Sequence, residues 1–98
     1  MTKINNHLNS IGKEIFITYY NDLKNFNLNK EELAVRMCNE NPDAHSLKAQ
    51  IIRINLSRKL FERNEHIEAL RIIVASIKLP KWVVVKASEL LKDEIVEA

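Results

Sequence analysis

The side chains that could carry out catalysis or bind a metal ion are few and lie far apart in the sequence. The three histidines, His7, His45 and His66, have no cysteine or carboxylate partner at the spacing of metal ligands. The chain has a single glycine, so it also lacks the glycine-rich loop that cradles phosphates. We therefore expect no catalytic residue, no metal ion and no cofactor, and we expect that the protein is not an enzyme.

Cysteine usage and hydropathy indicate a cellular compartment. Cys38 is the only cysteine, so no disulfide can form within the chain, which suits a reducing environment. No apolar run approaches the length of a membrane span, and the N-terminus lacks the apolar core of a signal peptide. We expect a cytoplasmic protein with no membrane partner. Abundant Asn, Ile and Lys suggest AT-biased coding, as in some bacteria, their plasmids and their phages.

Basic side chains are concentrated in the middle of the chain. Residues 48–86 carry nine basic and three acidic side chains, whereas residues 87–98 carry one and four. A cluster of positive charge of this kind favours binding to a polyanion. The alternative is a solvated basic face that is partly neutralised by the acidic end of the chain.

The segment from Ser46 to Arg63 is predicted to be the central helix. At about 100° per residue its apolar side chains form two groups on opposite sides. One group is Leu47, Ile51, Ile54 and Phe61, and the other is Ala49, Ile52, Leu56 and Leu60. Its polar side chains form a strip of Lys48, Asn55, Lys59 and Glu62, with Gln50, Arg53 and Ser57 on a second edge. A helix that is apolar on two sides must be covered on both, so we expect it in the middle layer of the fold.

Arg58 lies near the middle of one of these apolar faces. A charged group there needs a partner or must extend to solvent. We expect it to form an ion pair with Glu62, or with Asp22 or Glu32 from another helix. Contact with a phosphate is the second interpretation.

The part of the chain before the central helix is predicted to hold two helices. An apolar stripe with spacings of three and four residues predicts the first, most securely over 11–25. The second should begin near Lys30, because the Asn29 side chain can cap it and the Glu32 side chain can accept a hydrogen bond from the Asn29 backbone in return. Leu28 can also pack on Leu33 as a hydrophobic staple.

The boundaries around the central helix follow from residues that interrupt helices. The second helix should end before Pro42, and either Asp43 or Ser46 should cap the central helix. Asn64 should end it in a left-handed turn.

Two helices are predicted after the central one, over 66–79 and 82–96, separated at Pro80. The alternative is a two-stranded wing over 71–86, because that region is rich in β-branched residues. The fold class that we expect is a single all-α domain, residues 1–98, built as a compact bundle of four to five helices. A winged arrangement with the hairpin at 71–86 is the alternative.

Residues 29–60 resemble a helix-turn-helix DNA-binding unit. The stretches NKEELAVRMC, from Asn29, and SLKAQIIRINLSRKL, from Ser46, are similar to the DNA-binding region of sigma factors and related response regulators. The intervening turn, 39–45, is longer than the usual three or four residues. The resemblance implies that the start of the second helix enters the major groove. It also implies nucleic-acid contacts by Ser46, Lys48, Gln50 and Arg53 on bases or phosphates, and by Lys59 and Arg63 on the backbone.

Residues 56–80 resemble a single tetratricopeptide-type helical hairpin. In that pattern Ser57 and Ala69 take the small-residue positions, Asn64 the turn glycine and Pro80 the end. His66 replaces the usual aromatic residue, and the proline comes one position early. No second copy is visible, so the resemblance implies a hairpin inside a bundle and not a repeat array.

The two resemblances imply different functions. The first hypothesis is a small DNA-binding protein of helix-turn-helix type, regulatory or accessory, that forms a homodimer to read paired half-sites. The second is a helical module that binds another protein, as an adaptor or inhibitor, without nucleic acid. Two apolar faces on the central helix count against its full insertion into a groove, which leaves its first two turns as the segment able to read DNA.

Overall fold

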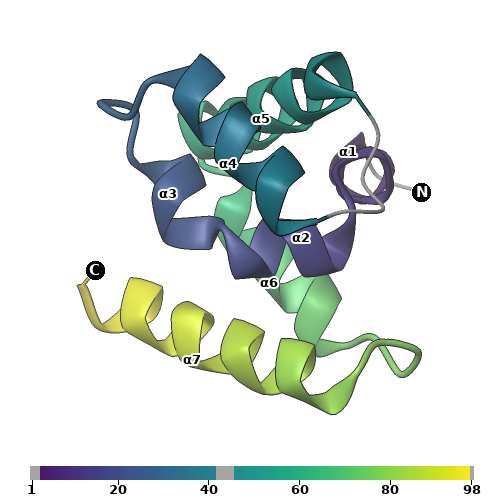
Figure 1. The fold of residues 1–98 in the computed structure, drawn as a ribbon. Coiled ribbons are helices and arrows are strands. Elements are labelled where there is room, and N and C mark those ends of the chain that lie inside the picture. Colours follow the sequence, from purple (N-terminus) through teal and green to yellow (C-terminus); the bar gives the residue numbers. More distant parts are fainter. Residues whose placement is uncertain (1–2, 42–45, 98) are drawn as a thin grey trace.

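The computed structural model describes residues 3–41 and 46–97, and every regular element within these ranges is a helix. The elements are α1 (Lys3–Ile11), α2 (Lys13–Thr18), α3 (Tyr20–Lys24), α4 (Lys30–Glu40), α5 (Leu47–Glu62), α6 (His66–Val74) and α7 (Lys81–Glu97). They form a globule of 32 × 29 × 24 Å (Figure 1). The predicted all-α class is confirmed.

The N-terminal segment is three short helices, and the prediction of one helix there is wrong. Gly12 has φ +92°, a conformation that side-chain-bearing residues rarely adopt, and it separates α1 from α2. Tyr19 leaves helical geometry with φ −107° and ψ 19° and separates α2 from α3. Most of the apolar stripe nevertheless points inward, because Leu8, Ile11, Tyr19 and Leu23, with Phe16 and Tyr20 beside them, join one core. Its last member, Phe26, is 48% exposed. These two breaks explain why seven helices are described where four or five were expected.

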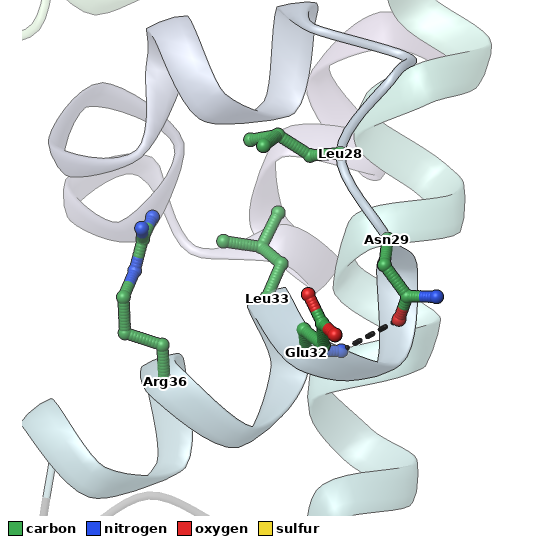
Figure 2. Close-up of a pocket in the computed structure, with 5 residues that line it drawn as sticks. All are labelled: Leu28, Asn29, Glu32, Leu33 and Arg36. Atoms are coloured by element: carbon green, nitrogen blue, oxygen red, sulfur yellow. Dashed lines mark hydrogen bonds between the residues drawn. The ribbon is translucent and has the colours of Figure 1, made fainter.

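The predicted start of α4 is confirmed. The Asn29 side chain accepts a hydrogen bond from the backbone N–H of Glu32 at 2.9 Å. Leu28 and Leu33 face one another beside this cap (Figure 2). At the other end, the Asn41 side chain donates to the Met37 carbonyl at 2.8 Å.

Ser46 is the N-cap of α5. Its hydroxyl accepts a hydrogen bond from the backbone N–H of Ala49 at 3.3 Å. The alternative cap, Asp43, lies outside the described residues, as do Pro42 and His45.

Helix α5 occupies the middle of the fold, as its two apolar sides predicted. It packs against α1, α3, α4 and α6. The side that is fully buried is centred on Gln50, Ile54, Ser57 and Leu60. Leu47 and Ile52, which were assigned to the apolar groups, are 43% and 50% exposed.

The region after α5 is helical, and the winged alternative is wrong. Asn64 adopts the predicted left-handed conformation with φ 56°. Helix α6 ends at Val74, earlier than predicted, and residues 75–80 form a turn. In this turn the backbone N–H of Lys78 donates a hydrogen bond to the Ser76 hydroxyl. Pro80 therefore does not end α6. It precedes α7, and its carbonyl accepts the N–H groups of Val83 and Val84.

A partly buried carboxylate fixes α7 to the rest of the molecule. Glu94, with a side chain 9% exposed, accepts hydrogen bonds from the Tyr20 hydroxyl at 2.5 Å and from the Lys24 ammonium at 2.8 Å. The Nε2 atom of His66 lies 3.4 Å from the same carboxylate. One side chain thus joins α3, α6 and α7, and it does so across large separations in sequence.

The pKa values of this cluster have opposing causes. Burial alone would raise the pKa of Glu94, but the hydrogen bonds from Lys24 and Tyr20 lower it below its ordinary value. Burial lowers the pKa of His66 by more than the neighbouring carboxylate of Glu94 raises it. The folded protein therefore favours a charged Glu94 and a neutral His66.

The conformation of Gly12 predicts a specific cost of substitution. Gly12→Ala should lower the free energy of unfolding by about 1–3 kcal/mol, since a side chain disfavours this backbone region. An added Cβ would meet no heavy atom closer than the 3.6 Å of Ile15 Cγ1, so the cost comes from the backbone and not from crowding. Urea denaturation would measure this loss of stability, with Ser10→Ala, at an exposed position of α1, as the control. Equal stability of both variants would contradict the assignment.

Acidification should destabilise the fold through His66. Its pKa is about 6.5 when the chain is unfolded and lower when folded, so the unfolded chain takes up the proton first and stability falls as the pH drops below 6.5. His66→Gln removes this titrating group. Between the unfolded and folded pKa values of His66, the thermal midpoint of the variant should therefore change less with pH than that of the unsubstituted protein. The pKa of Glu94 is lowered from 4.5, so its contribution is lost only below pH 4.5. The unsubstituted protein and His66→Gln should therefore both lose stability in that lower pH range. An unchanged slope just below pH 6.5 in His66→Gln would contradict the prediction.

Candidate nucleic-acid interface

One face of α5 is left uncovered by the surrounding helices. Lys48, Ile52, Asn55, Lys59 and Arg63, here called the α5 strip, follow one another at spacings of three or four residues and are all exposed. At a rise of about 1.5 Å per residue, Lys48 and Lys59 lie about 16 Å apart along the helix. The strip therefore presents cations at both ends of an extended surface.

Helix α4 adds a further cation beside the strip. The ammonium of Lys30 donates a hydrogen bond to the side-chain oxygen of Asn55 at 3.0 Å. Glu62, which is also exposed, brings one negative charge to this side of α5. Positive charge still predominates, with Lys30, Lys48, Lys59 and Arg63 against this carboxylate.

The C-terminal end of the strip borders a hollow that is also lined by α1. Lys3, Asn6 and His7 of α1, with Lys59 and Arg63 of α5, surround a volume of about 360 Å³, here called the basic hollow. Lys3, Lys59 and Arg63 have no ion-pair partner within the described part of the chain. Guanidinium, ammonium and amide groups are the donors that proteins use for phosphate oxygens. The arrangement can therefore hold a phosphate group.

One of the predicted contact residues, Gln50, is buried, and a second, Arg53, is half-buried and bound to it. Gln50 is 1% exposed, and its side-chain oxygen accepts a hydrogen bond from the guanidinium of Arg53 at 3.1 Å. Ser57, also buried, donates to the Arg53 carbonyl at 2.8 Å. The expected second polar edge of the central helix is thus part of its covered side. Gln50 and Arg53 bind each other here, so in this structure they do not offer a free pair of donors to a base.

The remaining predicted residues keep their exposure. Ser46, Lys48, Lys59 and Arg63 are all exposed, although the Ser46 hydroxyl is engaged in capping α5. Lys59 and Arg63 come together at the basic hollow, and Lys48 lies at the opposite end of the strip. The residues from α1 and α4 were not anticipated. Asn6 and His7 lie three and four residues after Lys3, so the sequence places all three on one side of a helix.

Arg58 does not form the predicted ion pair. Its guanidinium donates to the carbonyls of Leu28, at 3.0 Å, and Asn25, at 3.5 Å, and lies 5.4 Å from the ring centre of Phe26. The carbonyls of the turn between α3 and α4 thus take the place of a carboxylate. Of the candidate partners, Asp22 pairs instead with Arg36 of α4.

A second hollow, of about 210 Å³, lies at the start of α4. Leu28, Asn29, Glu32, Leu33 and Arg36 line it (Figure 2). Asn29 caps the helix and Arg36 is paired with Asp22, so two of its polar side chains already have structural partners. The hollow does not bring together groups for catalysis.

Within residues 3–41 and 46–97, no three His, Cys, Asp or Glu side chains are placed to hold a metal ion. No described helix is both long enough and apolar enough to span a bilayer.

Comparison with known proteins provides no relative. No family model matches the chain, and neither the curated proteins nor the solved structures gave a match.

Substitution of the adjacent residues Arg58 and Lys59 should affect stability differently, because only Arg58 has a structural role. Arg58→Met should lower the free energy of unfolding by about 1–2 kcal/mol, since it removes charge-assisted hydrogen bonds to the α3–α4 turn. Lys59→Met, at an exposed position without such bonds, should leave stability within about 0.5 kcal/mol. Chemical denaturation measures both. Equal stabilities would contradict the role given to Arg58.

Proposed function

We propose that the protein binds DNA chiefly through the phosphate backbone, using the α5 strip and the basic hollow. The observation that carries the proposal is the convergence of Lys3, Lys59 and Arg63 on one hollow without a carboxylate partner in the described structure. Like charges gathered in this way repel one another unless an anion joins them. Phosphates spaced along a nucleic acid would supply that anion both at the hollow and along the strip.

The placement of polar groups on α5 supports backbone contact more than base reading. Arg and Gln side chains specify bases through paired hydrogen bonds to their edges. The two candidates for such contacts, Gln50 and Arg53, bind each other on the covered side of the helix. What remains exposed near the start of α5 is Ser46 and Lys48. We therefore expect weak dependence on DNA sequence.

The resemblance to a helix-turn-helix unit supports DNA as the polyanion. Helices α4 and α5 pack against each other, as the two helices of such a unit do. In the proposed mode the uncovered side of α5 lies along the duplex, with Lys30 of α4 beside it. The four neighbouring helices cover the opposite side of α5.

A helical module that binds another protein is the second candidate. The observation that favours it is the exposure of Trp82 and Val85, at 51% and 48%, on α7. A protein partner would engage that surface and would be indifferent to the cations of α5.

The proposal predicts a salt-dependent affinity that is sensitive to two α5 residues. The logarithm of the association constant should fall linearly with the logarithm of salt, and Lys59→Ala/Arg63→Ala should make that slope shallower by about 1.8, or 0.9 per lost phosphate contact. Fluorescence anisotropy with a short labelled duplex, from about 50 to 200 mM salt, measures this.

A matched control removes the same charge elsewhere. Lys78→Ala/Lys81→Ala alters two exposed lysines, one in the turn before α7 and one at its first position. Helix α7 lies on the side of the molecule away from α5 in Figure 1. This double variant should keep the slope of the unsubstituted protein. Equal losses in both double variants would mean that binding follows net charge alone, and no binding at low salt would remove the proposal in favour of a protein partner.

A further inference from the structure

The charges of α7 are arranged against its own dipole. Lys81 and Lys86 lie in its N-terminal half, whereas Glu89, Asp93 and Glu94, with the single cation Lys92 among them, lie toward its C-terminal end. Its first turn contains no acidic residue and its last turn no basic residue. A helix is stabilised by the opposite order, because its N-terminus is the positive end of the dipole. An antiparallel helix with the same charge order would compensate both ends.

The side of α7 that faces away from the core is partly apolar. Val83 and Ala87 are fully buried and pack inward, where α7 contacts α6 and α2. On the opposite side Trp82, Val85, Glu89 and Lys92, here called the outer face of α7, follow at spacings of three, four and three residues. This is the spacing of the contact seam between paired helices. The first two members are large apolar side chains that are about half exposed.

We propose that the outer face of α7 binds a second copy of this chain, with the two α7 helices antiparallel. Lys86 and Asp93 are seven residues apart, which places them on one flank of the helix. In an antiparallel pair each Lys86 then lies opposite Asp93 of the other copy. Glu89 and Lys92 are centred on almost the same turn, so the same register also places them opposite each other. These four residues have no ion pair within the described part of the chain.

The self-complementary charge order selects a second copy over a different protein. A two-fold axis brings the same patch of both copies together, so every contact between two unlike residues occurs twice. An acidic or basic partner would match one half of α7 and repel the other. In the same register Val85 lies opposite position 94 of the other copy and Trp82 opposite position 97, so the apolar pair of each copy lies over the C-terminal end of the other α7.

Self-association should be visible without a label, because Trp82 is the only tryptophan in the chain. Sedimentation equilibrium over a range of concentrations should show a monomer–dimer transition. The tryptophan emission should shift to shorter wavelength over the same range, since the interface removes Trp82 from water. A monomer at every concentration, or a dimer whose formation leaves the emission unchanged, would overturn the proposal.

Charge reversal tests the register. Lys86→Glu alone and Asp93→Lys alone each place like charges opposite one another twice, and each should raise the dimer dissociation constant by tenfold or more, about 1.4 kcal/mol. An equimolar mixture of the two variants should form a heterodimer of ordinary affinity, because both contacts are then complementary. Singles that associate normally, or a mixture that does not recover, would overturn the antiparallel register.

Two further variants keep this result interpretable. The double substitution Lys86→Glu/Asp93→Lys in one chain should dimerise like the unsubstituted protein, which excludes misfolding as the cause of the single effects. Lys59→Glu, on α5, should also leave self-association unchanged. Failure of the double variant to dimerise while it remains helical by circular dichroism would count against the proposal.

Discussion

The enclosure of α5 by other helices is the constraint on which the rest of the structure depends. Helices α1, α3, α4 and α6 all pack against it, and the side they share contains Gln50, Ile54, Ser57 and Leu60. Polar atoms on that side are shielded from water, and most of them bind inside the protein. The Gln50 Oε1 atom accepts from the Arg53 guanidinium and the Ser57 hydroxyl donates to a carbonyl one turn earlier, whereas the Nε2 atom of Gln50 has no partner among the described residues. The polar side chains best suited to contact bases, Gln50 and Arg53, are therefore already bound to each other. What the enclosure leaves to solvent is a strip dominated by lysine and arginine.

Local signals in the sequence were sufficient to predict several boundaries. The Asn29 cap, the left-handed Asn64 and a C-terminal helix after Pro80 each depend on two or three neighbouring residues, so no tertiary information was needed. The breaks at Gly12 and Tyr19 were not predicted, because the apolar stripe continues through them at helical spacing. Helical periodicity reports which side chains point inward. It does not report whether the chain turns between them.

The burial of Gln50 and the Glu94 cluster show a second limit of the sequence. When a helix has apolar side chains on two sides, its sequence does not indicate which of the two polar edges between them is buried. In α5 the packing of the neighbouring helices determines which edge is covered. Glu94 meets Tyr20, Lys24 and His66, which come from distant segments, and nothing in the spacing of these residues indicates that they meet. The basic hollow has the same origin. Lys59 and Arg63 were candidates from the start, but their association with Lys3 and His7 required the packing of α1 on α5.

The two proposed surfaces lie on different sides of the molecule, and their separation has a mechanical consequence. In Figure 1, α2 and α6 lie between α5 and α7. A dimer formed through α7 would leave both α5 strips uncovered, with the bodies of the two copies between them. Helix-turn-helix dimers that read paired half-sites need their two reading helices about one helical turn of DNA apart on the same face. Strips carried on the far sides of such a dimer instead suit contact with two separate DNA segments. Backbone binding with little sequence preference and a bridging dimer are therefore mutually consistent, since neither needs a fixed spacing along one duplex.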